Sequence, residues 1–186
     1  MSALRAVEAP GIEPNPVRIG PMRRRHLAAV LRIERQVYPR PWTIGLYLGE
    51  LALPSSRVYL VARIGHRVVG YGGLMLSFDE GHVTTLAVDP TLHGQQVGTR
   101  VLLELAQRAL SRGARSLTLE VRMSNEPAKS LYRKFGFAPA GVRKNYYPEV
   151  NEDALVMWAH DTDSDEYARR LAGIEAELPS PSLVDG

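Results

Sequence analysis

The chain has 186 residues, of which 45% are hydrophobic, and a formal net charge of +3; this fits one domain with a real core, and the mild charge does not by itself argue for nucleic-acid binding. Without cysteine, the chain can form no disulfide, thiolate metal site or cysteine acyl-enzyme. The first twenty residues hold no apolar run of signal-peptide length and no span reaches membrane length, so we expect a cytoplasmic protein that contacts neither membrane nor nucleic acid directly.

The N-terminal quarter is predicted to hold a leader, a strand and two helices. Residues 1–16 are rich in Pro, Glu and Gly, which is typical of a mobile leader. A short strand is expected over 17–22. Apolar residues then recur at helical spacing over 23–38, and the three arginines that open this helix are interpreted as a solvated basic face. Thr43 is a plausible N-cap for a second helix through Leu53.

Three strands with short turns follow, and they predict an antiparallel meander. The first two are expected over 57–64 and 67–78. The third ends in the apolar, β-branched stretch Thr84–Val88, which suits a buried strand, and Pro90 stops it because proline cannot donate to the ladder.

Glycines occur next in the loop His93–Thr99, directly before a helix expected over 98–112. Gly94 and Gly98 let the backbone come close to a ligand, and free N–H groups with the positive end of the helix dipole form an anion site. Glycines before a helix are also common without any ligand, so the spacing alone leaves both interpretations open.

The remaining pattern alternates strands and helices. A strand over 115–121 is separated by a helix from Thr84–Val88, so these two strands should run parallel. The further elements expected are a helix over 125–135, strands over 137–144 and 154–160 linked by 145–148, a helix over 161–178 and a loose tail over 178–186.

Four stretches of this sequence resemble the GNAT family of acetyl-coenzyme-A-dependent N-acetyltransferases. They are LAVDP at 86–90, LEVRMSNEPAKSLYRKFGF at 119–137, RKNYYP at 143–148 and the pair Pro41-Trp42. The last three resemble its RimI branch, which acetylates the N-terminal α-amine of a small-subunit ribosomal protein. The resemblance covers roughly residues 17–160 and implies a mixed α/β (α+β) GNAT fold of about seven strands with flanking helices and a splayed parallel pair. Residues 161–186 would then be a C-terminal extension.

The resemblance also implies a direct attack of the amine on acetyl-CoA, with a general base and a general acid. Glu120 would be the base. From the alternation of the strand alone, this residue can also be a solvent-facing carboxylate with no catalytic role. Tyr132 would be the acid for the thiolate of coenzyme A; its alternative is a core aromatic. Asn125 would contact the cofactor, or serve only as a helix N-cap.

The cofactor site implied by the resemblance is the third meander strand with the loop after it. The loop departs from the family pattern, in which a basic or amide residue and two glycines recur: His93 replaces the first, Gln96 replaces the first glycine, and only Gly98 stands in place. This departure bears on how tightly coenzyme A is held. The residues expected to bind the cofactor are Leu86, Ala87, Val88, Gly94, Gln95, Gln96, Val97, Gly98, Thr99 and Asn125.

The amine channel would be lined by Trp42, Tyr146 and Tyr147, with Glu34 nearby; ordinary packing or a solvated helix face also explains each of them. The five histidines show no metal-ligand spacing, so no metal is expected. The acceptor would be an Ala-initiated ribosomal protein and the enzyme a monomer. The alternatives are a GNAT enzyme for a small amine and a non-catalytic module that binds acyl-coenzyme A or a ribosomal partner.

Overall fold

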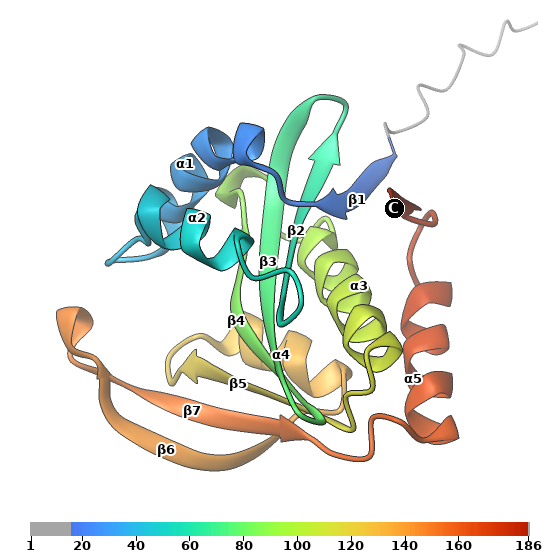
Figure 1. Cartoon of the computed structure of the whole chain (residues 1–186). Helices are drawn as coiled ribbons and strands as arrows, with labels where there is room; N and C mark the ends of the chain where they lie inside the picture. The colour runs from blue at the N-terminus through green and yellow to red at the C-terminus, as the bar shows by residue number, and fades with distance from the viewer. Residues whose placement is uncertain (1–15, 186) are drawn as a thin grey trace, which may run out of the picture.

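The structure is a computed structural model that describes residues 16–185. In this part of the chain, one sheet of eight strands is flanked by five α-helices and three short 3-10 turns (Figure 1). None of these helices is long and apolar enough to cross a membrane. The elements in chain order are β1 (Val17–Pro21), η1 (Arg24–His26), α1 (Leu27–Val37), α2 (Ile44–Leu51), β2 (Arg57–Ile64), β3 (Arg67–Ser77), β4 (Glu80–Val88), η2 (Pro90–Leu92), α3 (Val97–Ser111), β5 (Ser116–Arg122), α4 (Glu126–Lys134), β6 (Ala138–Tyr147), η3 (Pro148–Val150), β7 (Glu152–Ala159), α5 (Asp165–Ala176) and β8 (Leu183–Val184).

The sheet has the strand order β6-β7-β5-β4-β3-β2-β1-β8, and this mixed architecture confirms the predicted fold class. Strands β2, β3 and β4 form the predicted antiparallel meander, and β4 runs parallel to β5. The parallel pairing ends at Val83 and Leu119, although both strands continue. Beyond this point the two strands diverge, as the predicted splayed pair requires.

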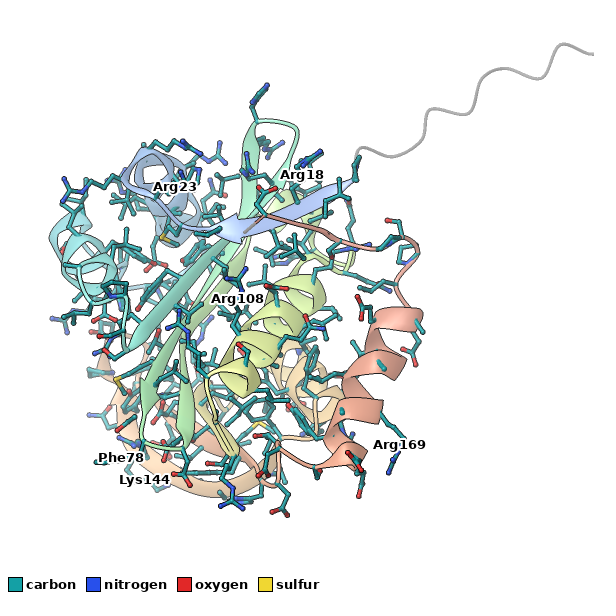
Figure 2. The ribbon with its side chains drawn as sticks, turned by 45° about the vertical axis from the view of Figure 1, so that its right-hand side comes forward. Arg18, Arg23, Phe78, Arg108, Lys144 and Arg169 are labelled. Atoms are coloured by element: carbon teal, nitrogen blue, oxygen red, sulfur yellow. The ribbon has the colours of Figure 1, made fainter. Side chains whose placement is uncertain are left out.

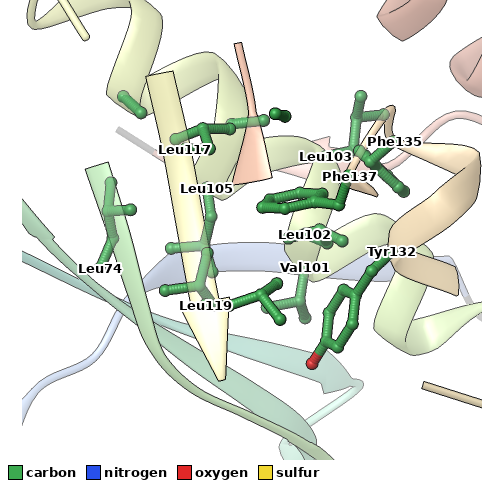
Figure 3. Close-up of a cluster of buried hydrophobic side chains, with 14 of the residues drawn as sticks. Leu74, Val101, Leu102, Leu103, Leu105, Leu117, Leu119, Tyr132, Phe135 and Phe137 are labelled. Atoms are coloured by element: carbon green, nitrogen blue, oxygen red, sulfur yellow. The ribbon is translucent and has the colours of Figure 1, made fainter. Parts of the chain in front are cut away.

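Helices cover both faces of the sheet and create two apolar cores. Helices α1 and α2 pack on one face of the meander, where Leu27, Ile33 and Tyr47 are buried. Helix α3 packs on the other face, and α4 and α5 contribute to the same core as α3. Figure 3 shows this larger core, in which Leu105 and Phe137 are buried with side chains from the strands.

Three expectations about element boundaries are wrong. The first α-helix begins at Leu27 instead of residue 23, because a 3-10 turn precedes it and the ring of His26 accepts the backbone N–H of Arg23. The segment over 145–148 is mostly strand, because a bulge between Arg143 and Tyr147 lets β6 continue and the turn falls in η3. The tail forms β8, which gives eight strands instead of about seven.

The tail is held because β1 has an edge that β2 leaves free. Strand β8 pairs parallel with this edge. Asp185 contacts Arg63 at 2.5 Å and Arg18 at 3.6 Å, and Arg108 donates to its backbone carbonyl. In Figure 2, Arg18 and Arg108 lie on β1 and α3, the elements beside this strap. We define the C-terminal strap as residues 180–185.

The helix expected over 161–178 corresponds to α5, whose apolar face packs against α3. Tyr167, Leu171 and Ile174 are buried there, and Leu178 packs partly against the same core. Of the expected leader, residues 1–15 lie outside the described residues. The division into leader, central domain and extension stays a prediction.

Candidate active site

A cavity of about 260 Å³ lies where β4 and β5 diverge. We name it the strand cavity. Its walls come from the divergent parts of both strands, from α1 and the loop after it, from α4 and from the end of β6. The predicted residues that line it are Glu34, Trp42, Leu86, Glu120, Asn125, Tyr132, Tyr146 and Tyr147.

Glu120 lies on β5 one residue beyond the last parallel pair, and its side chain is only 8% exposed. Its Oε2 lies 2.7 Å from Nε2 of His82, and its Oε1 lies 3.0 Å from a guanidinium nitrogen of Arg143. The hydrogen bond from His82 is the largest influence that lowers the pKa of Glu120, Arg143 adds to it, and desolvation opposes both. The carboxylate is therefore ionised near neutral pH.

Tyr132 belongs to the core and to the cavity at once. Its ring packs edge-on against Phe137, with 5.9 Å between the ring centroids, so the core interpretation describes the ring correctly. In Figure 3 its hydroxyl points away from the apolar cluster. Burial raises the pKa of this phenol well above its usual range, so the hydroxyl keeps its proton near neutral pH.

The C-terminal end of β4, beyond Val83, has one edge that pairs with no strand among the described residues. Asp89 N–H donates to Val69 on β3, and N–H groups alternate sides along a strand, so the N–H of Val88 points away from β3 toward the divergent side. On that edge Tyr38 Oη donates to the carbonyl of Leu86 at 2.9 Å. Nε2 of His93 lies 3.2 Å from the carbonyl of Val88, so both carbonyls of this edge have side-chain partners while the N–H of Val88 faces the divergent side.

A second cavity, of about 450 Å³, lies between this edge, the loop before α3 and α4. We name it the loop cavity. It shares Leu86, Asn125 and Tyr132 with the strand cavity, so the two form one continuous site. All the predicted cofactor residues line it except Gln95, which lies outside both cavities.

The N-terminus of α3 opens into the loop cavity without a side-chain cap. Gln96 occupies the N-cap position in the left-handed region, with φ 59°, and its side chain makes no cap hydrogen bond. Arg100 is the first residue whose N–H bonds back into the helix, to the carbonyl of Gln96. The N–H groups of 97–99 are therefore left to bind an anion, helped by the helix dipole.

Asn125 is the N-cap of α4, as its alternative interpretation predicts. Its Oδ1 accepts the N–H of Ala128 at 3.2 Å. The residue also lines both cavities, so a side chain committed to the cap still faces the site.

Glu34 lines the strand cavity and is almost fully buried. Its carboxylate accepts the backbone N–H of Trp42 at 3.1 Å and the hydroxyl of Tyr71. Burial raises the pKa of Glu34, against the lowering effect of these hydrogen bonds. Tyr146 and Tyr147 pack edge-on at the opposite wall, with 5.1 Å between centroids. The site thus holds two carboxylates whose environments shift their pKa values in opposite directions.

Sequence reasoning missed three groups around the site: His82, Arg143 and Tyr38. Arg143 stands in the RKNYYP motif, so its contact with Glu120 had a signal in the sequence. His82 lies two residues before the predicted buried stretch Thr84–Val88, and no motif in the sequence pointed to it. Within the described residues, no group of three or more His, Asp or Glu side chains is arranged to hold a metal ion.

Comparison with known proteins gives a consistent assignment. A model of the acetyltransferase (GNAT) family matches residues 27–137. The chain is 36% identical over 148 residues to N-alpha-acetyltransferase RimI of Mycobacterium tuberculosis, covering 76% of this chain and 91% of that protein. It is 32% identical over 133 residues to ribosomal protein bS18-alanine N-acetyltransferase of Salmonella typhimurium, covering 70% and 88%.

Solved structures agree with these relatives. The ribosomal-protein-S18-alanine N-acetyltransferase from Escherichia coli is 28% identical with a TM-score of 0.73, covering 81% of this chain and 97% of that one. The PaiA N-acetyltransferase from Thermoplasma acidophilum, solved in complex with coenzyme A, has a TM-score of 0.65 at 16% identity, covering 77% and 98%, and supports the fold alone.

Proposed function

The chain belongs to the GNAT family of acetyltransferases, and we propose that it transfers acetyl from acetyl-CoA to the N-terminal α-amine of a ribosomal protein. The observation that carries this proposal is the joined site between the divergent strands. An ionised carboxylate, Glu120, and a protonated phenol, Tyr132, both line the strand cavity, and the uncapped start of α3 opens into the adjoining loop cavity. The relatives named for acetylation of ribosomal protein bS18 support the acceptor class.

Acetyl-CoA supplies an acetyl thioester, and the loop cavity has the groups to hold its carrier. N–H groups at the start of α3 would bind the pyrophosphate. A Cβ on Gly98 would meet Leu131 and Val88 at 3.5 Å, which is ordinary contact, so the close approach of the pyrophosphate would be the reason for glycine at this position. The edge of β4 at 86–88 would lie along the extended arm, and the N–H of Val88 would donate to the thioester carbonyl.

Glu120 would take a proton from the acceptor ammonium, directly or through water. An α-amine has a pKa of about 7.7–8.0, so part of it is neutral near pH 7 and the base removes the remainder. Tyr132 would give its proton to the departing thiolate. The raised pKa of this phenol suits that role, because an acid must carry its proton until the leaving group needs it.

Trp42, Tyr146 and Tyr147 would enclose the first residue of the acceptor. A cavity of about 260 Å³ with aromatic walls favours small first side chains such as alanine or serine. Glu34 accepts hydrogen bonds from Trp42 and Tyr71, so it would fix the Trp42 wall. A lysine side chain, with a pKa of about 10.4, is rarely neutral near pH 7 and should be a poor acceptor.

The proposal is tested by comparing an Ala-initiated peptide, an N-blocked lysine peptide and spermidine as acceptors. The free α-amine should react fastest. Glu120→Gln should lower turnover roughly 10²-fold, the usual scale for loss of a general base, and the defect should shrink as pH rises past the α-amine pKa. Glu80→Gln is the matched control, because Glu80 lies in the same sheet but lines neither cavity.

Tyr132→Phe separates the acid role from packing. It should lower turnover and leave acetyl-CoA affinity unchanged, whereas Tyr167→Phe, in the same core but away from both cavities, should leave turnover intact. Faster transfer to spermidine than to the α-amine would contradict the ribosomal-protein assignment. Acetyl-CoA binding with no transfer to any amine would indicate a non-catalytic module instead.

A further inference from the structure

His82 and Glu120 form a close pair across the two parallel strands at the point where they diverge. His82 is paired in register with Thr118 on β5, and Glu120 lies two residues further along β5. Alternate side chains on a strand share a face, so all three lie on one face of the sheet. His82 Nε2 and Glu120 Oε2 are 2.7 Å apart.

The two side chains differ in what they face. Glu120 lines the strand cavity, whereas His82 lines neither cavity. The His82 side chain is 25% exposed, and its Nδ1 has no hydrogen-bond partner among residues 16–185. The pair therefore reaches from the wall of the cavity to solvent by a path that does not pass through the cavity itself.

The other groups around Glu120 cannot carry a proton away near neutral pH. From β6, the guanidinium of Arg143 donates hydrogen bonds but has no site that accepts a proton, and burial raises the pKa values of Tyr146 and Tyr147, which remain neutral. The β7 neighbour of Glu120 is the apolar Val156. The strand neighbours of His82, Met75 and Thr118, are uncharged. An imidazole has two ring nitrogens, so it can accept a proton on one and release a proton from the other.

The reaction requires such an exit. An ammonium and an acetyl thioester give an amide, a thiol and one proton: of the two protons that the nitrogen loses, one goes to the thiolate and the other must reach solvent. The acceptor and the coenzyme would fill the cavities while this happens. A carboxylate that keeps the proton cannot serve as a base in the next turnover.

We propose that His82 is a positioning residue that holds Glu120 toward the acceptor and passes its proton to solvent. While Glu120 is ionised, Nε2–H of His82 donates to it. Once Glu120 is protonated, the ring exchanges through solvent to the Nδ1–H tautomer, Nε2 takes the proton of Glu120, and Nδ1 releases its own proton to water, which restores the Nε2–H tautomer. No bond other than N–H and O–H changes. This inference rests on the proposed acetyl transfer to an amine.

The test compares His82→Gln with His66→Gln, an exposed histidine in the β2–β3 turn that lines neither cavity. Glutamine can still donate a hydrogen bond to Glu120 but cannot relay a proton. Since proton-transfer groups contribute roughly 10²–10⁴-fold and Glu120 remains, we expect His82→Gln to lower kcat by about tenfold with little change in KM. His66→Gln should match the wild type.

Chemical rescue separates a proton path from a structural role. In His82→Ala, added imidazole should restore kcat in proportion to its concentration, because the site is open to solvent, and should do nothing for the wild type. A wild-type kcat in His82→Gln between pH 6 and 8, or a defect in His82→Ala that no buffer base relieves, would overturn the proposal.

The assay uses whichever amine the wild-type protein acetylates, since every ammonium releases the same proton. A protein that prefers spermidine would contradict the ribosomal-protein acceptor and still test His82. A protein that prefers the α-amine but shows no effect of His82 would contradict only the present inference.

Discussion

Replacing Gln96 by glycine should stabilise the protein, although Gln96 lies in the candidate cofactor loop. Gln96 is the N-cap of α3 with φ 59°, a left-handed conformation that costs an L-residue with a Cβ about 1–2 kcal/mol. Its Oε1 is buried without a hydrogen-bond partner among the described residues, and such an orphaned acceptor costs roughly 1–3 kcal/mol. Glycine removes both penalties.

Two effects oppose this gain. Glycine has greater conformational freedom in the unfolded chain, which costs about 0.4–1 kcal/mol. The contacts of the partly buried carbons of Gln96 are also lost. The balance favours Gln96→Gly by about 1 kcal/mol, which for a domain of this size raises Tm by roughly 2–4 °C. The matched control is Gln95→Gly. Gln95 lies in the same loop, is exposed and has no positive φ, so its replacement should lower Tm slightly.

Thermal unfolding of the wild type and the two variants without ligand checks this reasoning, and calorimetry with acetyl-CoA extends it. Gln96→Gly should also bind acetyl-CoA more tightly, alone or with His93→Arg, because both changes return the loop to the family pattern. A lower Tm for Gln96→Gly, or an equal rise for Gln95→Gly, would refute the assignment of strain to this residue.

Three further predictions concern the loop, the strap and acid stability. Gly98→Val should raise the Kd for acetyl-CoA about tenfold, roughly 1.4 kcal/mol, with Gly98→Ala intermediate by calorimetry. Deletion of 180–186 removes the Ser180 and Ser182 acceptors of the buried Arg100 guanidinium and should cost about 2 kcal/mol in urea unfolding, less in an Arg100→Met background. The Thr91 hydroxyl and then Arg67 lower the pKa of Asp89 to about 2. The stabilisation from its carboxylate is therefore present above about pH 4 and lost toward pH 2. The difference in unfolding free energy between the wild type and Asp89→Asn should disappear over that range.

The elements predicted correctly from the sequence are those with a clear hydrophobic periodicity or with residues that clearly begin or end a helix or strand. The amphipathic face of α3, the short turns of the meander and the Thr43 cap were all readable, and Thr43 does accept the N–H of Leu46. The errors fall where tertiary contacts override local pattern. The strap has no apolar period, and it becomes a strand only because β1 offers a free edge and Arg63 and Arg108 bind its last described residue.

The candidate site was predicted more fully as a set of residues than as an arrangement. Glu120 and Tyr132 come from motifs, and both lie at the divergence of β4 and β5. For Tyr132 the sequence left two alternatives, a general acid and a core aromatic, yet its ring lies in the core and its hydroxyl at the cavity. A side chain long enough to have two environments need not be assigned to one of them.

The charged and polar contacts of Glu120 could not be predicted from the sequence. His82 lies 38 residues before Glu120, and no local pattern links them. Their contact exists because a parallel strand pair stops pairing one residue after His82, which brings the two side chains together beside the gap. The same contact both lowers the pKa of Glu120 and leaves it a weaker base than an isolated carboxylate. A base held in this way works in repeated turnovers only if its proton has somewhere to go, and in the described structure the imidazole of His82 is the group placed to receive it.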